Sequence, residues 1–103
     1  MDAVSVNTVP GGALHVVLRG EIDFTNSAWV RKVICDAVAE QRPPAVRVEM
    51  AEVAFLDSSG IGMLVDVMRA AGEADAAFRV EHPTSRVYDQ LRTAGLLAAF
   101  GLP

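Results

Sequence analysis

Four short stretches of the chain alternate hydrophobic with polar residues, which is the pattern of β-strands with one buried face. They cover residues 4–8, 14–20, 45–50 and 77–80. The turn sequence Pro10-Gly11-Gly12 separates the first two stretches, so we expect these two to form a β-hairpin. Glu49 is a charged residue inside the third stretch, and we expect it either on a polar face of the sheet or near a functional loop.

Three further stretches have hydrophobic residues at helical spacing. We expect the first helix between a cap at Thr25 or Ser27 and the stop at Pro43-Pro44, and the second from Ser58 to about Ala71. The third helix should start at Pro83-Thr84-Ser85 and end near Gly95. The predicted inner faces are Val30, Val33, Ile34, Ala37 and Val38, then Ile61, Leu64, Val65 and Met68, then Val87, Tyr88, Leu91 and Ala94.

The alternation of strands and helices after an initial hairpin predicts an α/β fold, a mixed sheet with helices packed on it. The turn Gly72-Glu73-Ala74-Asp75 should link the second helix to the fourth strand. With 103 residues, of which 51% are hydrophobic and 21% charged, the chain is expected to form a single domain over residues 1–103. The apolar tail 96–103 should pack down or meet a partner.

Charge and composition exclude several classes of function. The net charge is −4 and no basic patch with interleaved aromatics is present, so we expect no direct binding of nucleic acid. No apolar run approaches 18 residues, and residues 1–5 lack signal-peptide character, so no membrane segment is expected. The one cysteine, Cys35, is typical of a reducing compartment, and we expect a cytoplasmic monomer with Cys35 in a packing role.

The segment Asp57-Ser58-Ser59-Gly60 joins the third strand to the second helix and is the main candidate for function. A serine oxygen there could accept from the unpaired N–H groups of the first helical turn, so an ordinary capping cluster is one interpretation. A phosphate-accepting or phosphate-binding site is the other, because a helix N-terminus favours anions. Gly60 and Gly62 cost helix stability, which suggests a close backbone approach there.

The stretch from Phe55 to Gly62 resembles the signature of STAS domains, in particular the stand-alone bacterial anti-sigma factor antagonists. Gly20-Glu21-Ile22-Asp23 is similar to the motif at the end of the family's second strand. The run His82 to Val87, followed by Leu91 and Gly95-Leu96, matches the last helix region. The resemblance implies a STAS fold, a four- to five-stranded mixed sheet with about three to four helices.

The resemblance also implies a regulatory cycle. The unmodified domain would bind an anti-sigma factor serine kinase of the GHKL type and release a sigma factor. The kinase would then phosphorylate Ser58, and a PP2C-type phosphatase would reverse the modification. The partner surface would comprise Asp23, Asp57, Ser58, Ser59, Gly60, Gly62, Met63 and Asp66. From the residues alone, a capping or turn aspartate is the favoured interpretation of Asp23, and Met63 and Val67 are equally well partly buried packing residues.

Two other functions are alternatives to this switch. A STAS subunit of a transport system, or a nucleotide or ligand sensor without phosphorylation, fits the same resemblance. An enzyme is disfavoured, because Ser58 lacks a Gly-x-Ser-x-Gly elbow and nothing places His15 or His82 beside it. The sequence shows no metal-ligand spacing and no phosphate-binding Walker loop, so no catalytic residue, metal or cofactor is expected.

Overall fold

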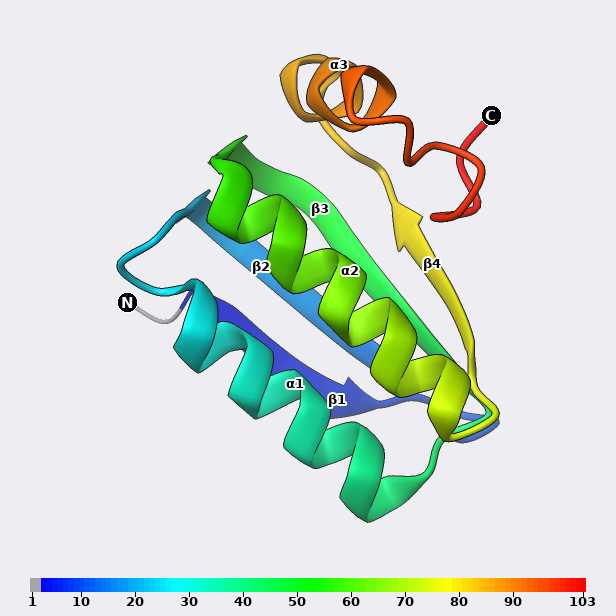
Figure 1. The fold of residues 1–103 in the computed structure, drawn as a ribbon. Helices are drawn as coiled ribbons and strands as arrows, with labels where there is room; N and C mark the ends of the chain where they lie inside the picture. Colours follow the sequence, from blue (N-terminus) through cyan, green and yellow to red (C-terminus); the bar gives the residue numbers. More distant parts are fainter. Residues whose placement is uncertain (1–2) are drawn as a thin grey trace.

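The computed structural model describes residues 3–103. Met1 and Asp2, and with them part of the prediction made for the N-terminal segment, lie outside the described residues. Residues 3–103 form a mixed four-stranded sheet and three helices (Figure 1). In chain order the elements are β1 (Val4–Thr8), β2 (Leu14–Ile22), α1 (Ser27–Gln41), β3 (Ala45–Leu56), α2 (Ser58–Glu73), β4 (Ala77–Glu81) and α3 (Ser85–Thr93).

The spatial order of the strands is the same as their sequence order. β1 and β2 pair antiparallel, which confirms the predicted hairpin, and Gly11 and Gly12 in its turn have φ of +95° and +90°. β2 pairs parallel with β3, and β3 parallel with β4. The carboxyl ends of β2 and β3 therefore point to the same edge of the sheet, and both loops that leave this edge lead into helices.

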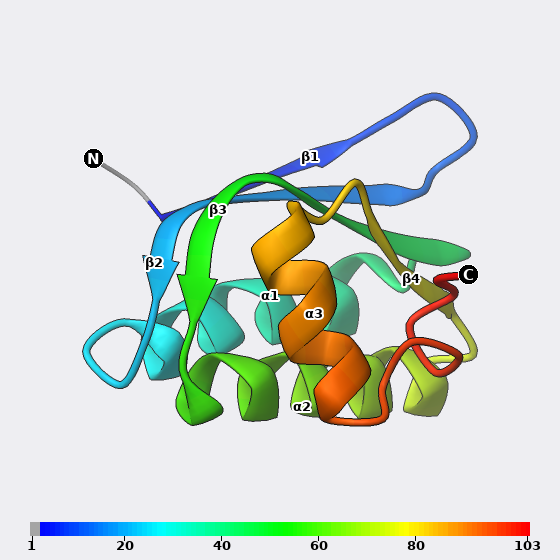
Figure 2. The same ribbon diagram turned by 90° about the horizontal axis from the view of Figure 1, so that it is seen from above.

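Helices α1 and α2 lie side by side on one face of the sheet (Figure 2). Apolar side chains of both helices and of the inward strand positions make the core, including the fully buried Leu18, Ile34, Val48 and Leu64. The second helix departs from the predicted inner face. Met63 and Val67, which lie off the predicted inner face, are buried, in agreement with the packing alternative, because that side of the helix packs against α1, whereas Ile61, Val65 and Met68 remain partly exposed.

Strand β3 runs six residues past the predicted end at Met50. Its alternation breaks where Ala51 and Glu52 are both exposed, and the pairing with β2 shifts register at this point and again before Glu21. Such bulges place an extra residue in one strand and reset which face the next side chain occupies. A period-two pattern therefore ends at the first bulge although the strand continues.

Smaller boundary predictions also needed correction. Helix α1 has Asn26 at its N-cap position without a side-chain cap, so neither Thr25 nor Ser27 caps it. Helix α2 includes Gly72 and Glu73, and the turn that follows is formed by Ala74 and Asp75.

Helix α3 packs beside β3 at the edge that the short β4 leaves open, and the tail packs against β4. Ala94 is exposed and Tyr88 half-buried, so the buried face of α3 is narrower than predicted, while Gly95 has the expected positive φ of 75°. The tail packs down, as one of the two alternatives predicted. The Phe100 ring is fully buried and meets the Phe78 ring edge-on, with ring centroids 5.6 Å apart.

The sheet face opposite α1 and α2 has no helix over it (Figure 2) and is lined by charged side chains. Glu81 accepts from Arg47 and Arg79, each at an N–O distance of 3.0 Å. His82 Nδ1 lies 2.7 Å from Glu49 Oε1, so Glu49 belongs to this polar face, the first of its two predicted positions. A half-exposed ionic layer replaces apolar packing on this face.

Candidate functional site

The loop between β3 and α2 is fixed by the carboxylate of Asp57. Its Oδ1 accepts from the Gly60 N–H at 3.0 Å, which makes Asp57 the N-cap of α2, and its Oδ2 accepts from the Phe24 N–H at 2.9 Å. The Asp57 N–H donates to the Ile22 carbonyl oxygen at 3.2 Å. The capping interpretation is therefore confirmed, with Asp57 and not a serine as the cap, and Asp57 ties the β2–α1 loop to the start of α2.

Because Asp57 performs the capping, the two serine hydroxyls are not needed for it. Ser58 is the first residue of α2 and is exposed, while Ser59 is half-buried. The first free N–H groups of a helix carry partial positive charge and attract anions. Ser58 thus presents a nucleophilic hydroxyl to solvent at a position that favours an attached phosphate.

The two glycines of the motif have different roles. A Cβ added to Gly60 would lie 2.4 Å from the Ile22 carbonyl oxygen, so the close approach predicted for this segment is made by the end of β2. Gly60 is buried and cannot contact a partner through a side chain or an open face. Gly62 is exposed, and an added Cβ there would meet nothing within 4 Å.

Asp23 lies in the adjacent loop, at the end of β2. Its Oδ1 accepts from the Thr25 hydroxyl and from the Thr25 N–H at 2.9 Å, as a turn aspartate does. These bonds hold the pKa of the Asp23 carboxyl below its usual range, so the group is ionised at neutral pH. The bond from Phe24 to Asp57 brings the loop that carries Asp23 against the loop that carries Ser58.

A shallow hollow of about 210 Å³ lies between the N-terminal halves of α1 and α2. Met63 and Ser59 form part of its lining from α2, where Gly62 and the exposed Asp66 also lie. Met63 is only 3% exposed, so it contributes to the floor of this hollow, and its burial agrees with the packing role, one of its two predicted roles. Ser27, Ala28 and Arg31 line the hollow from α1.

Two aromatic side chains beside the site are unusually exposed. Phe24, in the β2–α1 loop, is 78% exposed, and Trp29, in the first turns of α1, is 51% exposed. From the sequence, Trp29 is the only tryptophan and is expected to be half-buried on the first helix, which its exposure bears out, whereas sequence reasoning did not single out Phe24. The signal in the sequence is a large apolar residue between two polar ones, Asp23 and Thr25, in a segment that leaves the strand and is exposed to solvent.

The wider chemistry of residues 3–103 is limited. Within this range no group of three or more acidic, cysteine or histidine side chains is arranged to hold a metal ion. No helix in the same range is long and apolar enough to span a membrane. Burial raises the pKa of the Cys35 thiol, which makes it a weak nucleophile at neutral pH.

Comparisons with known proteins agree with this geometry. The sequence model of the STAS domain family matches residues 5–102 of this chain. A solved anti-sigma factor antagonist from Mycobacterium paratuberculosis is 26% identical, with a TM-score of 0.85 over 96% of this chain and 82% of that one. The phosphorylated form of the Bacillus cell fate determinant SpoIIAA is 20% identical, with a TM-score of 0.75 over 95% of this chain and 87% of its own.

A sulfate transporter family protein from Wolinella succinogenes is similar in the same way. It is 21% identical, with a TM-score of 0.77 over 92% of this chain and 76% of that one. At this identity, and at the 20% of the Bacillus protein, the likeness establishes a common fold. No curated protein sequence matches the chain.

Proposed function

Because this chain belongs to the STAS domain family, we propose that it is an anti-sigma factor antagonist controlled by phosphorylation of Ser58. The unphosphorylated domain binds an anti-sigma factor serine kinase of the GHKL type in the cytoplasm and thereby releases a sigma factor. The kinase transfers phosphate from ATP to Ser58, the complex dissociates, and a PP2C-type phosphatase restores the hydroxyl. The domain is the substrate of this cycle and performs no catalysis itself.

The observation that carries the proposal is the exposed Ser58 hydroxyl at a helix N-terminus that another residue already caps. Phosphorylation of a capping serine would break the cap and perturb the fold. Here Asp57 keeps the cap, so Ser58 is free to change its charge by about −1.5 to −2. The helix dipole stabilises the added charge within the domain.

The same charge would disfavour a bound partner. Ser58 stands next to the Asp57 carboxylate, and the ionised Asp23 lies in the neighbouring loop. A phosphate added inside an interface loses its hydration and repels acidic groups nearby. A thousandfold loss of affinity requires only about 4 kcal/mol.

The proposed partner surface differs from the one expected from sequence. It keeps the exposed or half-buried Asp23, Ser58, Ser59, Gly62 and Asp66, with Met63 as a buried floor. It adds the Phe24 and Trp29 rings and drops Gly60. Asp57 contributes to this surface indirectly, because its carboxylate holds the backbone of the two loops in place.

A second function is a STAS subunit of a transport system or a nucleotide sensor that is not phosphorylated. The likeness to the Wolinella sulfate transporter family protein favours it. Direct binding of ATP or GTP by the purified domain, with no phosphate on Ser58 under any growth condition, would support this function over the first.

Intact-mass measurement with site mapping tests the proposal. The purified protein is incubated with ATP, magnesium and extract of its native cells, beside Ser58→Ala. The expected result is one added phosphate on the wild type, mapped to Ser58 and missing from the variant. Phosphate on Ser59 alone would keep the switch and move its site, and no phosphate under any condition would refute it.

A further inference from the structure

The side chain of Gln90 on helix α3 bonds the last residue of β3, immediately before the loop that carries Ser58. The Gln90 Nε2 donates to the Leu56 carbonyl oxygen at 2.6 Å, and its Oε1 accepts from the Leu56 N–H at 3.2 Å. Leu56 is the last residue of β3 and immediately precedes Asp57-Ser58. A primary amide that bonds both backbone groups of one residue occupies the place of a neighbouring strand.

Strand β3 needs such a substitute at this point. Its pairing with β4 covers only Ala45 to Glu49, and the remaining residues extend past the end of that ladder. On its other side, Leu56 pairs with Ile22 of β2. Gln90 therefore completes the backbone hydrogen bonding of Leu56 on the side that β4 leaves open.

Leu56 is in direct contact with the start of α2. The position of an added Gly60 Cβ lies 3.2 Å from the Leu56 Cδ2 atom, and the Leu56 side chain is fully buried. A displacement of Leu56 would shift the first turn of α2 and with it the Ser58 hydroxyl. The chain of contacts runs from α3, through Gln90 and Leu56, to the phosphoacceptor.

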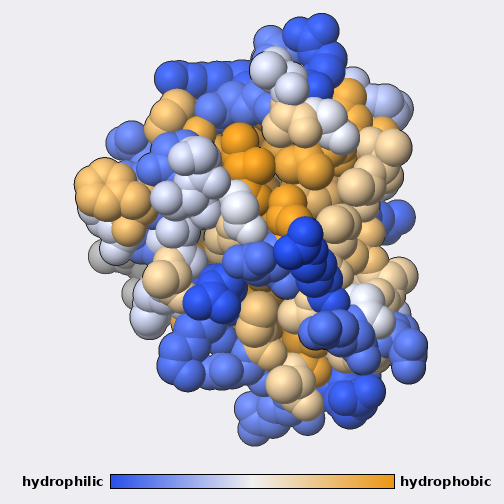
Figure 3. Space-filling model, in the orientation of Figure 1, coloured by the Kyte–Doolittle hydropathy of each residue, from blue (hydrophilic) through white to orange (hydrophobic). Residues whose placement is uncertain are grey.

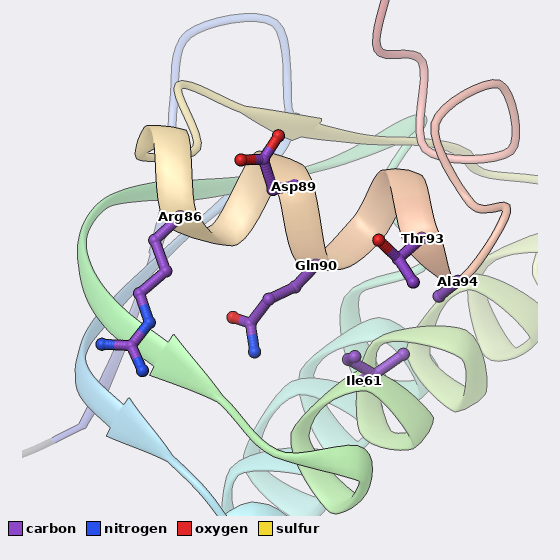
Figure 4. Close-up of a pocket in the computed structure, with 6 residues that line it drawn as sticks. All are labelled: Ile61, Arg86, Asp89, Gln90, Thr93 and Ala94. Carbon is purple, nitrogen blue, oxygen red and sulfur yellow. The ribbon is translucent and has the colours of Figure 1, made fainter.

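A groove of about 520 Å³ between α2 and α3 exposes this connection. Figure 4 shows Gln90 extending from α3 towards the end of β3, with Ile61 on α2 across from Thr93 and Ala94. In Figure 3 hydrophobic side chains gather over this side of the helical face, bordered by hydrophilic ones. Arg86, one turn before Gln90, lies 4.9 Å from the centre of the Phe55 ring and adds a second contact to the end of β3.

We propose that Gln90 is a positioning residue for Ser58 phosphorylation, holding the hydroxyl in the orientation that a kinase requires. This inference rests on the proposed function of Ser58. Phosphoryl transfer depends on the alignment of the attacking oxygen, and a displacement of about 1 Å can cost about a hundredfold in rate. Gln90 does not touch the reacting atoms and acts through Leu56.

The test uses three variants of the full chain. Gln90→Met removes both bonds at similar side-chain volume, and Gln90→Glu keeps an acceptor for the Leu56 N–H while losing the donor to its carbonyl. Thr93→Val, on the same helix and in the same groove, is the matched control. Hydrogen exchange followed by NMR reports the loop, and initial rates with the kinase captured from native extract report phosphate transfer.

In Gln90→Met we expect the hydrogen-bonded amides of Leu56 and Gly60 to exchange about tenfold faster, while the core amide of Val16 is unchanged. The kcat for Ser58 phosphorylation should fall about tenfold with KM within about twofold, because binding contacts remain. Gln90→Glu should show an intermediate effect and Thr93→Val none. If Gln90→Met fails to fold, Gln90→Glu against Thr93→Val decides the result.

Unchanged exchange in both Gln90 variants would show that Gln90 does not anchor Leu56. Faster exchange with an unchanged kcat would overturn the positioning role of Gln90. An equal loss in Thr93→Val would also contradict the inference, because the effect would then belong to the helix as a whole. A wild type that accepts no phosphate would refute the proposed function and the role in phosphate transfer together. The exchange data would still decide whether Gln90 anchors the loop.

Discussion

Asp57 and Ser58 are neighbours with separate duties. Asp57 bonds the amides of Gly60 and Phe24, while Ser58 has an exposed side chain on the outside of the turn. The sequence identified the motif and its helix but not this division, because aspartate and serine have similar preference for the cap position. Only the register between the ends of β2 and β3 decides which side chain faces the β2–α1 loop.

We predict that Asp57→Ala lowers the free energy of unfolding by about 2 kcal/mol, since it removes a helix cap and leaves the Phe24 amide without its acceptor. Urea denaturation measures the change, with Ser58→Ala as control and an expected change within about 0.5 kcal/mol. Equal effects of the two substitutions would show that the serine shares the capping.

The glycines Gly60 and Gly62 provide a matched pair at the same scale. Gly60→Ala should destabilise the fold by about 2 kcal/mol, because the new methyl group meets the Ile22 carbonyl oxygen. Gly62→Ala, in open space on the same helix, should stabilise it by about 1 kcal/mol through helix propensity. Thermal or urea unfolding of both variants measures the contrast, and a stabilising Gly60→Ala would contradict the close approach.

At the scale of elements, the predictions were most accurate where periodicity is strong and solvent-facing sides are polar. The hairpin and the existence of all three helices follow from such patterns. The buried side of α2 could not be predicted in this way. Because α2 packs on both the sheet and α1, it has two apolar sides and no single apolar stripe. The predicted third strand ended too early for a related reason. The bulges of β3 are set by its pairing with β2 and not by its own sequence.

The ionic layer on the uncovered sheet face predicts a pH dependence of stability. Partial burial raises the pKa of Glu81, but the hydrogen bond and charge of Arg47 and the charge of Arg79 outweigh it, so the net pKa lies below the usual 4.5. A carboxyl with a lowered pKa stabilises the fold above its unfolded pKa and loses that contribution as pH falls through the folded value.

Glu81→Gln should therefore lower the free energy of unfolding by about 1 kcal/mol at pH 7. The difference from wild type should shrink as pH falls below 4.5, the usual value of the group. Urea denaturation at several pH values measures it. A gap between the two proteins that stays constant down to pH 2 would exclude Glu81 as its source.

The tail behaves as an element although it is neither helix nor strand. The Phe100 carbonyl oxygen accepts from the Val80 N–H at 2.9 Å, and its ring fills the core beside Phe78. Phe100→Ala should lower the free energy of unfolding by about 3–4 kcal/mol, as other large-to-small core changes do. Denaturant titration gives the value, and a loss below about 1 kcal/mol would mean that the tail is not part of the cooperative core.

At the scale of the whole molecule, the stability of the fold should not depend on whether Ser58 carries a negative charge. Ser58→Asp should change the free energy of unfolding by less than about 1 kcal/mol, because an exposed charge at a helix N-terminus is tolerated. Binding to the captured kinase should weaken at least about a hundredfold under the proposed mechanism. Unfolding curves and a binding titration separate the two effects, and a variant that unfolds would contradict a surface switch.

The arrangement at Asp57 also has an evolutionary consequence. Its carboxylate serves two backbone amides, and its own N–H serves the Ile22 carbonyl oxygen, so a sequence that drifts at this position must rebuild two loops together. Replacing the Ser58 side chain breaks none of these three bonds. Under the proposed function, one substitution at Ser58 would therefore remove the phosphorylation control and keep the fold, and the result would be an antagonist that stays active.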